Sequence, residues 1–225
     1  SFDLRTKRFT NYTHSSSDPG TISDNHISAL YEDKYGEMLI GTENGLNIYN
    51  KKTEKIRHYY QDNSKPGNIS HNFIRCIIQD HVGDIWIGTD GGGLNKMSYD
   101  RPGKSAGFIH FRNGPDENNF ISHDIVYCLL EDNSENLWIG TLTGVNKTDL
   151  KKKSLRSYRK SDNPNSINLL DNVIASVFQD SDGKLWIGNW GKGLNIVDRR
   201  TNEVVHYTAE QSGNRHIPQN HVHVI

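Results

Sequence analysis

The sequence predicts an all-β protein, a β-propeller built from repeated four-stranded sheets, and three observations lead to this fold class. First, an Ile-Gly pair recurs four times, preceded by Trp in three copies and by Leu39 in the other. Second, its glycines lie 47, 52 and 48 residues apart, periods typical of propeller blades of about 40–50 residues. They are Gly41, Gly88, Gly140 and Gly188. Third, no segment has the sustained apolar period of about 3.6 residues that marks a helix.

Each repeat opens with an apolar run that predicts its first strand, as in residues 73–80, 125–132 and 173–180. A tight turn follows, in which an Asp side chain bonds the following amides and a Gly supplies a positive φ. The repeated acids are Asp33, Asp80, Asp132 and Asp180. Unit three has Glu135 where the other units have glycine, so we expect its turn to differ or to be strained.

The "LWIG" segment predicts the second strand, and its glycine-rich exit predicts a hairpin into the third strand rather than a phosphate cradle. A short outer strand, such as "KIRHYY" or "GFIHFR", completes the unit. We therefore expect blades at about 22–60, 69–112, 121–159 and 169–208. Sheets set around an axis bury both faces, which explains the apolar first strands. The repeated tryptophans are expected to wedge between blades, burying roughly 150–250 Å² per ring: Trp86, Trp138 and Trp186.

The two ends of the chain predict an incomplete arc of a larger ring. Residues 2–13 resemble an outer strand without a blade before it, and residues 217–225 resemble the opening strand of a next blade. Residues 1–225 are therefore expected to form one partial β-propeller, whose natural start lies upstream of Ser1. An open arc leaves two blade faces unpaired, and we expect the remaining blades or another copy of the chain, as in a homodimer, to cover them.

Composition excludes several classes of function. The formal net charge is −1 and the pI about 6.8, so no global field favours nucleic acid as a partner. No apolar run approaches the roughly 18 residues of a membrane helix, and no signal peptide opens the chain. Cys76 and Cys128 occupy the same repeat position and give no disulfide framework, so we interpret them as small core residues.

The repeat "ISHNFIRCIIQDHVGDIWIGTDGGGLN", with connectors such as "DNSKPGNISHN", "DENNFISHD" and "DNPNSINLLDN", resembles the two-component-regulator propeller repeat. The resemblance covers essentially the whole chain and departs from the pattern at Leu39 and Glu135. It implies paired seven-bladed propellers in the periplasmic sensor of a membrane-bound hybrid histidine kinase, of a kind common in gut Bacteroidetes. An immunoglobulin-like module, a membrane helix, a kinase, a receiver and a DNA-binding domain are implied to follow.

The same resemblance implies recognition of oligosaccharides released from polysaccharides, and signalling as a dimer. This chain has neither a phosphoacceptor helix nor an ATP-binding glycine box. We therefore expect recognition without catalysis and without a cofactor. Two other interpretations stay open: a propeller enzyme, such as a polysaccharide lyase or hydrolase that uses a funnel acid or a His-Tyr pair, and a protein-interaction scaffold.

Positions that differ between the copies are the candidates for binding. One column of the first strands reads Ser28, Arg75, Tyr127, Ala175 and His223. The first strand is innermost in a propeller, so its polar residues are placed to face the central funnel. Arg75, Tyr127 and His223 offer a cation, an aromatic platform and a titratable donor, a set that suits a glycan, and Arg75 suits an acidic sugar. The default interpretation of such residues is solvated strand ends with local hydrogen bonds.

Four more candidates lie close to this column. His221 is two residues before it, and His71 and His123 are four residues before it. Trp190 stands in a turn where the other copies have Glu43, Asp90 and Leu142. It is expected either to be exposed for stacking or to pack on the next blade.

No metal site or catalytic residue is expected. His221 and His223 lack a third ligand for zinc. "DSDGK" at 180–184 imitates a calcium loop, but position twelve of that loop is Gly191, which has no carboxylate. "RPGKSAG" at 101–107 has Ser98 where a phosphate loop needs glycine.

Overall fold

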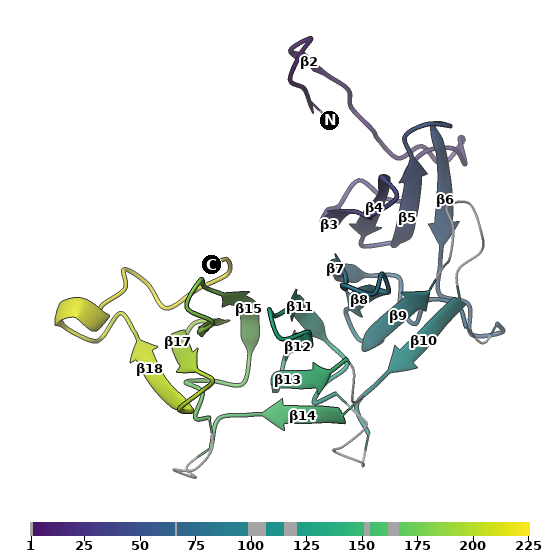
Figure 1. Cartoon of the computed structure of the whole chain (residues 1–225). Helices are drawn as coiled ribbons and strands as arrows, with labels where there is room; N and C mark the ends of the chain where they lie inside the picture. The colour runs from purple at the N-terminus through teal and green to yellow at the C-terminus, as the bar shows by residue number, and fades with distance from the viewer. Residues whose placement is uncertain (1, 66, 99–106, 115–120, 151–153, 162–166) are drawn as a thin grey trace.

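The chain forms an open arc of four antiparallel four-stranded sheets, or blades (Figure 1). The computed structural model describes all residues except 1, 66, 99–106, 115–120, 151–153 and 162–166. Most of the 101–107 segment, whose Gly-Lys-Ser resembles part of a phosphate loop, lies outside the described residues. The prediction of an all-β arc of four blades is confirmed.

The strands follow the order of the sequence from the inside of each blade to its outside. The first blade contains β3 (Ile27–Glu32), β4 (Glu37–Thr42), β5 (Gly45–Asn50) and β6 (Lys55–Tyr59). The second contains β7 (Ile74–Gln79), β8 (Ile85–Thr89), β9 (Leu94–Ser98) and β10 (Gly107–Phe111). The third contains β11 (Val126–Glu131), β12 (Asn136–Thr141), β13 (Gly144–Asp149) and β14 (Ser154–Tyr158). The fourth contains β15 (Ile174–Gln179), β16 (Leu185–Asn189), β17 (Gly193–Asp198) and β18 (Glu203–Tyr207).

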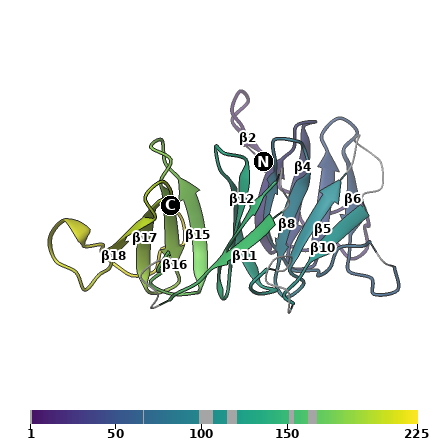
Figure 2. The ribbon, with the colours of Figure 1, turned by 60° about the horizontal axis from the view of Figure 1, so that its bottom comes forward.

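The first strands contact one another from blade to blade, β3 to β7, β7 to β11 and β11 to β15, and they line the inner side of the arc in Figure 1. Seen from the side, the blades stand next to one another with their strands roughly upright (Figure 2). Among the described residues the only helical element is a short 3₁₀ turn, Gly213–Arg215. No helix in that part of the chain is long and apolar enough to cross a membrane.

The N-terminal segment differs from the single outer strand expected at residues 2–13. Phe2–Asp3 (β1) pairs with Arg8–Phe9 (β2), and Lys7 in the connecting turn has a φ of 56°. The outer hairpin of the first blade has the same form, with Glu54 at a φ of 57°. Residues 2–9 are thus equivalent to the third and outer strands of a blade, because the same turn connects each pair.

Three apolar clusters fill the three interfaces between the blades. The first joins Leu39, Leu46 and Ile48 of blade one to residues of blade two, including Ile74 and Met97. In the second, Trp86 of blade two packs with Val126, Leu137 and Ile139 of blade three. In the third, Trp138 packs with Ile174, Leu185 and Ile187 of blade four. The indoles of blades two and three therefore lie against the next blade along the chain.

In the turn of unit three, Glu135 takes the backbone conformation that glycine has in the other units. Glu135 has a φ of 62°, the left-handed conformation that Gly36, Gly83 and Gly183 adopt in the other units at 80°, 99° and 80°. A non-glycine residue costs free energy in this conformation. The sequence expectation of a strained turn is confirmed.

Candidate functional site

The variable column of the first strands coincides with a β-bulge in every blade. The pairing of first and second strands shifts register between Ile27 and Ala29, and likewise around the other three positions of the column. The corresponding shifts occur at Ile74/Cys76, Val126/Cys128 and Ile174/Ser176. The residue skipped by the register is Ser28, Arg75, Tyr127 or Ala175. A bulge releases a residue from the ladder and re-aims its side chain. The repeat therefore supplies one redirected side chain in each blade.

Arg75 lies between two aromatic rings. Its guanidinium carbon is 4.7 Å from the ring centre of Phe73 and 4.8 Å from that of Tyr127 in the next blade. Its Nη2 is 3.1 Å from Oδ2 of Asp90, which follows strand β8 of the same blade. Arg75 is thus a cation paired with a carboxylate, and the pair as a whole carries no net charge.

Trp190 extends this arrangement toward the C-terminus. Its ring is stacked on Tyr127 with the centres 6.3 Å apart and the planes at 28°. Its other neighbours are His223, edge-on at 4.2 Å, and His221 at 6.3 Å. Ala175 occupies the bulge of blade four, and such a small residue leaves room for the indole between Tyr127 and His223. Trp190 is 48% exposed, so it both packs on the next strand and presents a ring to solvent.

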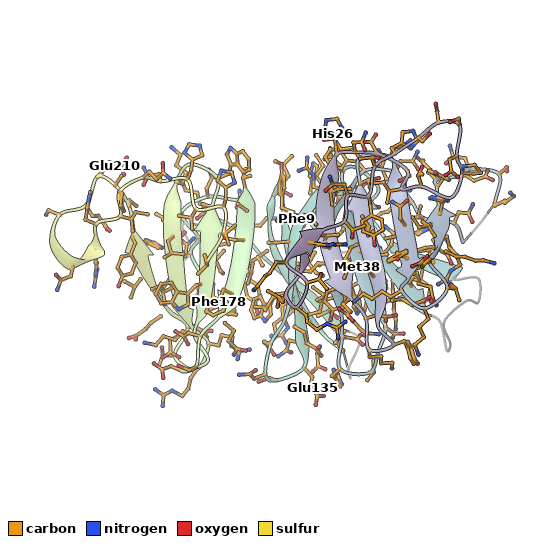
Figure 3. All side chains as sticks on the ribbon, turned by 90° about the horizontal axis from the view of Figure 1, so that it is seen from above. Phe9, His26, Met38, Glu135, Phe178 and Glu210 are labelled. Carbon is orange, nitrogen blue, oxygen red and sulfur yellow. The ribbon has the colours of Figure 1, made fainter. Side chains whose placement is uncertain are left out.

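These side chains form one continuous surface, which we call the aromatic strip: Phe73, Arg75, Tyr127, Trp190, His221 and His223. The strip crosses blades two, three and four and reaches the C-terminal segment. It lies toward the rim where the first strands begin, the rim marked by His26 in Figure 3, whereas Glu135 marks the opposite rim. Four of its six members come from first strands or from the segment equivalent to one, and Phe73 immediately precedes strand β7.

The C-terminal segment takes the place of a fifth first strand. The amide of Val222 donates to the carbonyl of Asn189 at 3.3 Å, and Trp190 forms an isolated bridge with His221. The hydroxyl of Ser176 donates to the carbonyl of Val222 at 3.2 Å. His221 and His223 thus reach the strip because their segment continues the repeat across the face of blade four.

The structure does not join His71 and His123 to the strip. The Nδ1 atom of His71 accepts the amide of Phe73 at 3.1 Å, and Nδ1 of His123 accepts the amide of Ile125 at 2.9 Å. Asp24 accepts the amide of His26 at the same place in blade one. These side chains hold the entry to the first strand, which is the local hydrogen bonding of the default interpretation.

Sequence reasoning missed Asp90 and Phe73 as members of the site. Asp90 occupies the repeat position of Trp190, and both residues are private to their blades. The alignment of Asp90 with Trp190 could have identified Asp90 as a site residue, because a residue at this turn position lies next to the bulge of its own blade. Phe73 was hidden by its place in an apolar run, where a core residue is expected.

Other histidines have structural partners. Nε2 of His58, His110 and His206 lies 2.8, 2.6 and 3.0 Å from the carbonyl oxygens of Thr21, Asn68 and Asn168. These bonds tie the outer strands to the connectors. Over the described residues, no group of three or more His, Cys, Asp or Glu side chains is arranged to hold a metal ion.

A hollow lies at the opposite rim from the strip. Its volume is about 730 Å³, and it is lined by residues of blades three and four that include Lys147, Lys184 and Arg200. Arg199 in its wall forms an ion pair with the buried Asp132 of blade three. This ion pair joins blade four to blade three beside the hollow.

The fold and the strip define a class of protein: a partial β-propeller of repeated four-stranded blades, with an exposed aromatic strip on its inner strands. The model of the two-component regulator propeller family matches residues 21–44, 68–91, 120–143 and 168–191. Each match runs from the connector through the first two strands to the turn that holds Asp90 or Trp190. The chain is built from two-component regulator propeller repeats, as the sequence resemblance indicated.

Solved structures with the same fold include the extracellular domain of a putative hybrid two-component system from B. thetaiotaomicron. It is 26% identical, with a TM-score of 0.73, over 86% of this chain and 26% of that domain. PorZ, a surface component of the type-IX secretion system of Porphyromonas gingivalis, is 17% identical with a TM-score of 0.64, over 92% of this chain and 30% of PorZ. Virginiamycin B lyase from Staphylococcus aureus is 13% identical with a TM-score of 0.55, over 81% of this chain and 55% of the lyase.

The last two likenesses show the fold alone, because their identities are low. The chain spans about a quarter of the length of the two-component domain. No curated protein matched the sequence.

Proposed function

We propose that this chain is part of the ligand-sensing propeller of a membrane-bound hybrid histidine kinase, that it lies in the periplasm, and that it recognises oligosaccharides released from polysaccharides. The repeat family and the likeness to an extracellular two-component domain support the sensing role. In this proposal the chain binds its ligand without catalysis, and the signal passes to a kinase and then to transcription. The unpaired blade faces contact the remaining blades or another copy of the chain in a homodimer.

The observation that carries saccharide recognition is the exposed stacking of Trp190. Sugar rings present flat C–H faces that pack on aromatic rings, and their hydroxyls need donors and acceptors close by. The strip combines the ring of Trp190 with Tyr127, His223 and the Arg75–Asp90 pair. Buried structural tryptophans such as Trp138, at 2% exposed, offer no such surface.

Thermal unfolding with a panel of oligosaccharides tests this proposal. A ligand at about 100 times its dissociation constant stabilises a protein by roughly 2.7 kcal/mol, which raises the melting temperature measurably. We expect such a rise with at least one saccharide, its loss in Trp190→Ala, and its retention in Phe178→Ala. Phe178 is a matched control because it is 43% exposed on β15 of the same blade, away from the strip.

Two results would contradict the proposal. No rise with any saccharide would exclude recognition by these blades. Release of products from a saccharide by the purified chain would exclude a purely sensing role and favour a propeller enzyme.

A further inference from the structure

The charge balance of the aromatic strip is set by Asp90. The guanidinium carbon of Arg75 lies over the rings of Phe73 and Tyr127, and its polar contacts are made by the N–H groups at the guanidinium edge. Part of that edge is taken by Asp90, at 3.1 Å. Both side chains remain partly exposed, at 29% and 25%, so a ligand on the strip meets the guanidinium and the carboxylate together.

The ion pair is not needed to form a blade. Blades one, three and four have Ser28, Tyr127 and Ala175 at the bulge, and Glu43, Leu142 and Trp190 at the turn position of Asp90. All three form the same four-stranded sheet as blade two. Only blade two places a cation at the bulge with a carboxylate over it. A feature that the fold does not require, located within the exposed strip, indicates a role in ligand selection.

We infer that the strip selects neutral over acidic saccharides and that Asp90 is the specificity-determining residue. This inference rests on the proposed saccharide recognition. A sugar hydroxyl both donates and accepts, so a neutral sugar satisfies the guanidinium edge and the carboxylate at once. A uronate carboxylate only accepts. It meets a guanidinium already paired with one carboxylate, and Asp90 repels it as a like charge, which disfavours acidic ligands.

Matched pairs of saccharides test the inference by isothermal titration. The probes are β-1,4-linked mannotetraose and cellotetraose, each beside the tetramer in which the C6 hydroxymethyl group is oxidised to a carboxylate. Measurements at about pH 8 keep the carboxylates of the acidic probes fully ionised. We expect the wild-type chain to bind the neutral member roughly tenfold more tightly than its acidic counterpart, which corresponds to about 1.4 kcal/mol.

Asp90→Asn is the decisive variant. It removes the repelling carboxylate and frees the charge of Arg75, so the preference should disappear or invert toward the uronate. Asp84→Asn is the matched control, because Asp84 also pairs with a cation, Lys96, and lies just before β8 at the opposite rim from Asp90. It changes the net charge equally and should leave the preference unchanged. Arg75→Gln retains Asp90. It should weaken binding of both saccharides of a pair, and the uronate should still bind less tightly than the neutral saccharide.

Each outcome decides between the two proposals. A wild-type preference for uronates, or an unchanged preference in Asp90→Asn, overturns the role of Asp90 while saccharide sensing stands. Binding of no saccharide in the panel by the wild-type chain overturns the proposed function together with this inference. Thermal unfolding of each variant checks that it is folded, and Arg75→Gln provides the test if Asp90→Asn is not.

Discussion

At the scale of single residues, the repeated Asp has a second role beside the turn bonds that the sequence predicts: it also binds the repeated Trp. Asp132 accepts the amides of Ser134 and Asn136 and also the indole N–H of Trp138, at 2.8, 3.0 and 2.7 Å. Burial of Asp132 raises its pKa, but these donors outweigh burial and hold the pKa below its usual value. Asp80 and Asp180 bond Trp86 and Trp186 in the same way, both at 2.8 Å. The Asp and the Trp are therefore one unit that joins the turn to the blade interface.

A histidine of blade two contacts two acidic side chains of blade three across the interface between these blades. His81 contacts the carboxylate of Glu131 through Nδ1, and its Nε2 is 3.4 Å from Oε2 of Glu135. The hydrogen bond with Glu131 raises the pKa of His81, and the charges of Glu131, Glu135 and Asp80 add to this effect. A raised folded-state pKa means that protonated His81 favours the folded chain.

We therefore expect His81→Gln to lower the free energy of unfolding relative to wild type below the ordinary histidine pKa of about 6.5. The difference should diminish as the pH rises through the raised pKa of the folded state. Urea denaturation of both proteins at a series of pH values measures it. Glu131→Gln should remove the same pH dependence, since it removes the main partner. A difference that grows with pH would contradict this assignment.

At the scale of the elements, the Ile-Gly glycine is explained by the distance between blades and not by its backbone conformation. A Cβ built on Gly88 would lie 2.4 Å from Sγ of Cys76 and 2.7 Å from Cγ1 of Val126 in the next blade. The corresponding distances from Gly140 to Cys128 and Ile174 are 2.4 and 2.8 Å. The two cysteines line these interfaces, and burial raises the pKa of both thiols, that of Cys128 to about 12.

Gly88→Ala should therefore destabilise the chain by about 1–3 kcal/mol, the usual cost of forcing extra volume into a packed interior. Gly107→Ala is the matched control, because a Cβ there meets nothing within 4 Å and its backbone is not left-handed. It should change stability by less than about 0.5 kcal/mol. Chemical denaturation of the two variants compares them. Equal losses would show that Gly88 acts through strand propensity and not through blade spacing.

The connectors are fastened to the blades by a buried amide that sequence reasoning did not identify. Asn47, Asn95 and Asn146 accept the amides of Ser23, Ser70 and Ser122 at 2.8, 2.9 and 3.0 Å. In blade four the connector residue is Leu170, which has no hydroxyl to accept a hydrogen bond from the side-chain amide of Asn195. There Asn195 donates to Oδ1 of Asn189 at 2.6 Å, and Asn189 stands where the other blades have threonine. The two exchanges compensate each other, because a buried amide needs its partners.

At the scale of the whole molecule, one face of each of blades two, three and four is covered by the preceding blade. The same face of blade one is exposed to solvent. Ile74, Val126 and Ile174 are fully buried against the glycine of the preceding blade. Ile27, in the same column, is 42% exposed, and Leu30 is 65% exposed where Ile77 is 6% exposed. This face of blade one thus has the apolar chemistry of an interface between blades.

We expect the isolated chain to self-associate through this face. Analytical ultracentrifugation over a concentration series should show association in the wild type and a shift toward monomer in Leu30→Lys, because a charge cannot be buried there without a partner. Val82→Lys is the control, since Val82 is equally apolar and 61% exposed but lies in the turn after β7. Monomers at every concentration of the wild type would contradict this expectation.

Much of the fold and part of the site are readable from the sequence. The repeat period, the turn acids and the strand pattern act locally, so the four sheets follow from residues close together in the chain. For the same reason Glu135 predicts its own left-handed turn. Arg75, Tyr127 and His223 were found by comparing the copies, because a repeat separates shared positions from private ones.

What the sequence by itself determined is the repeat, its four strands and the column of private residues. Only the tertiary structure decided which of these residues meet: a bulge re-aims Arg75 and Tyr127, and the spacing of the blades brings Trp190 between Tyr127 and His223. It also decided that Asp90 neutralises Arg75. These contacts join residues that are up to 63 positions apart in the chain, from Tyr127 to Trp190. Their geometry depends on how the blades pack, because no local pattern encodes the direction of a bulged side chain or the distance between two sheets.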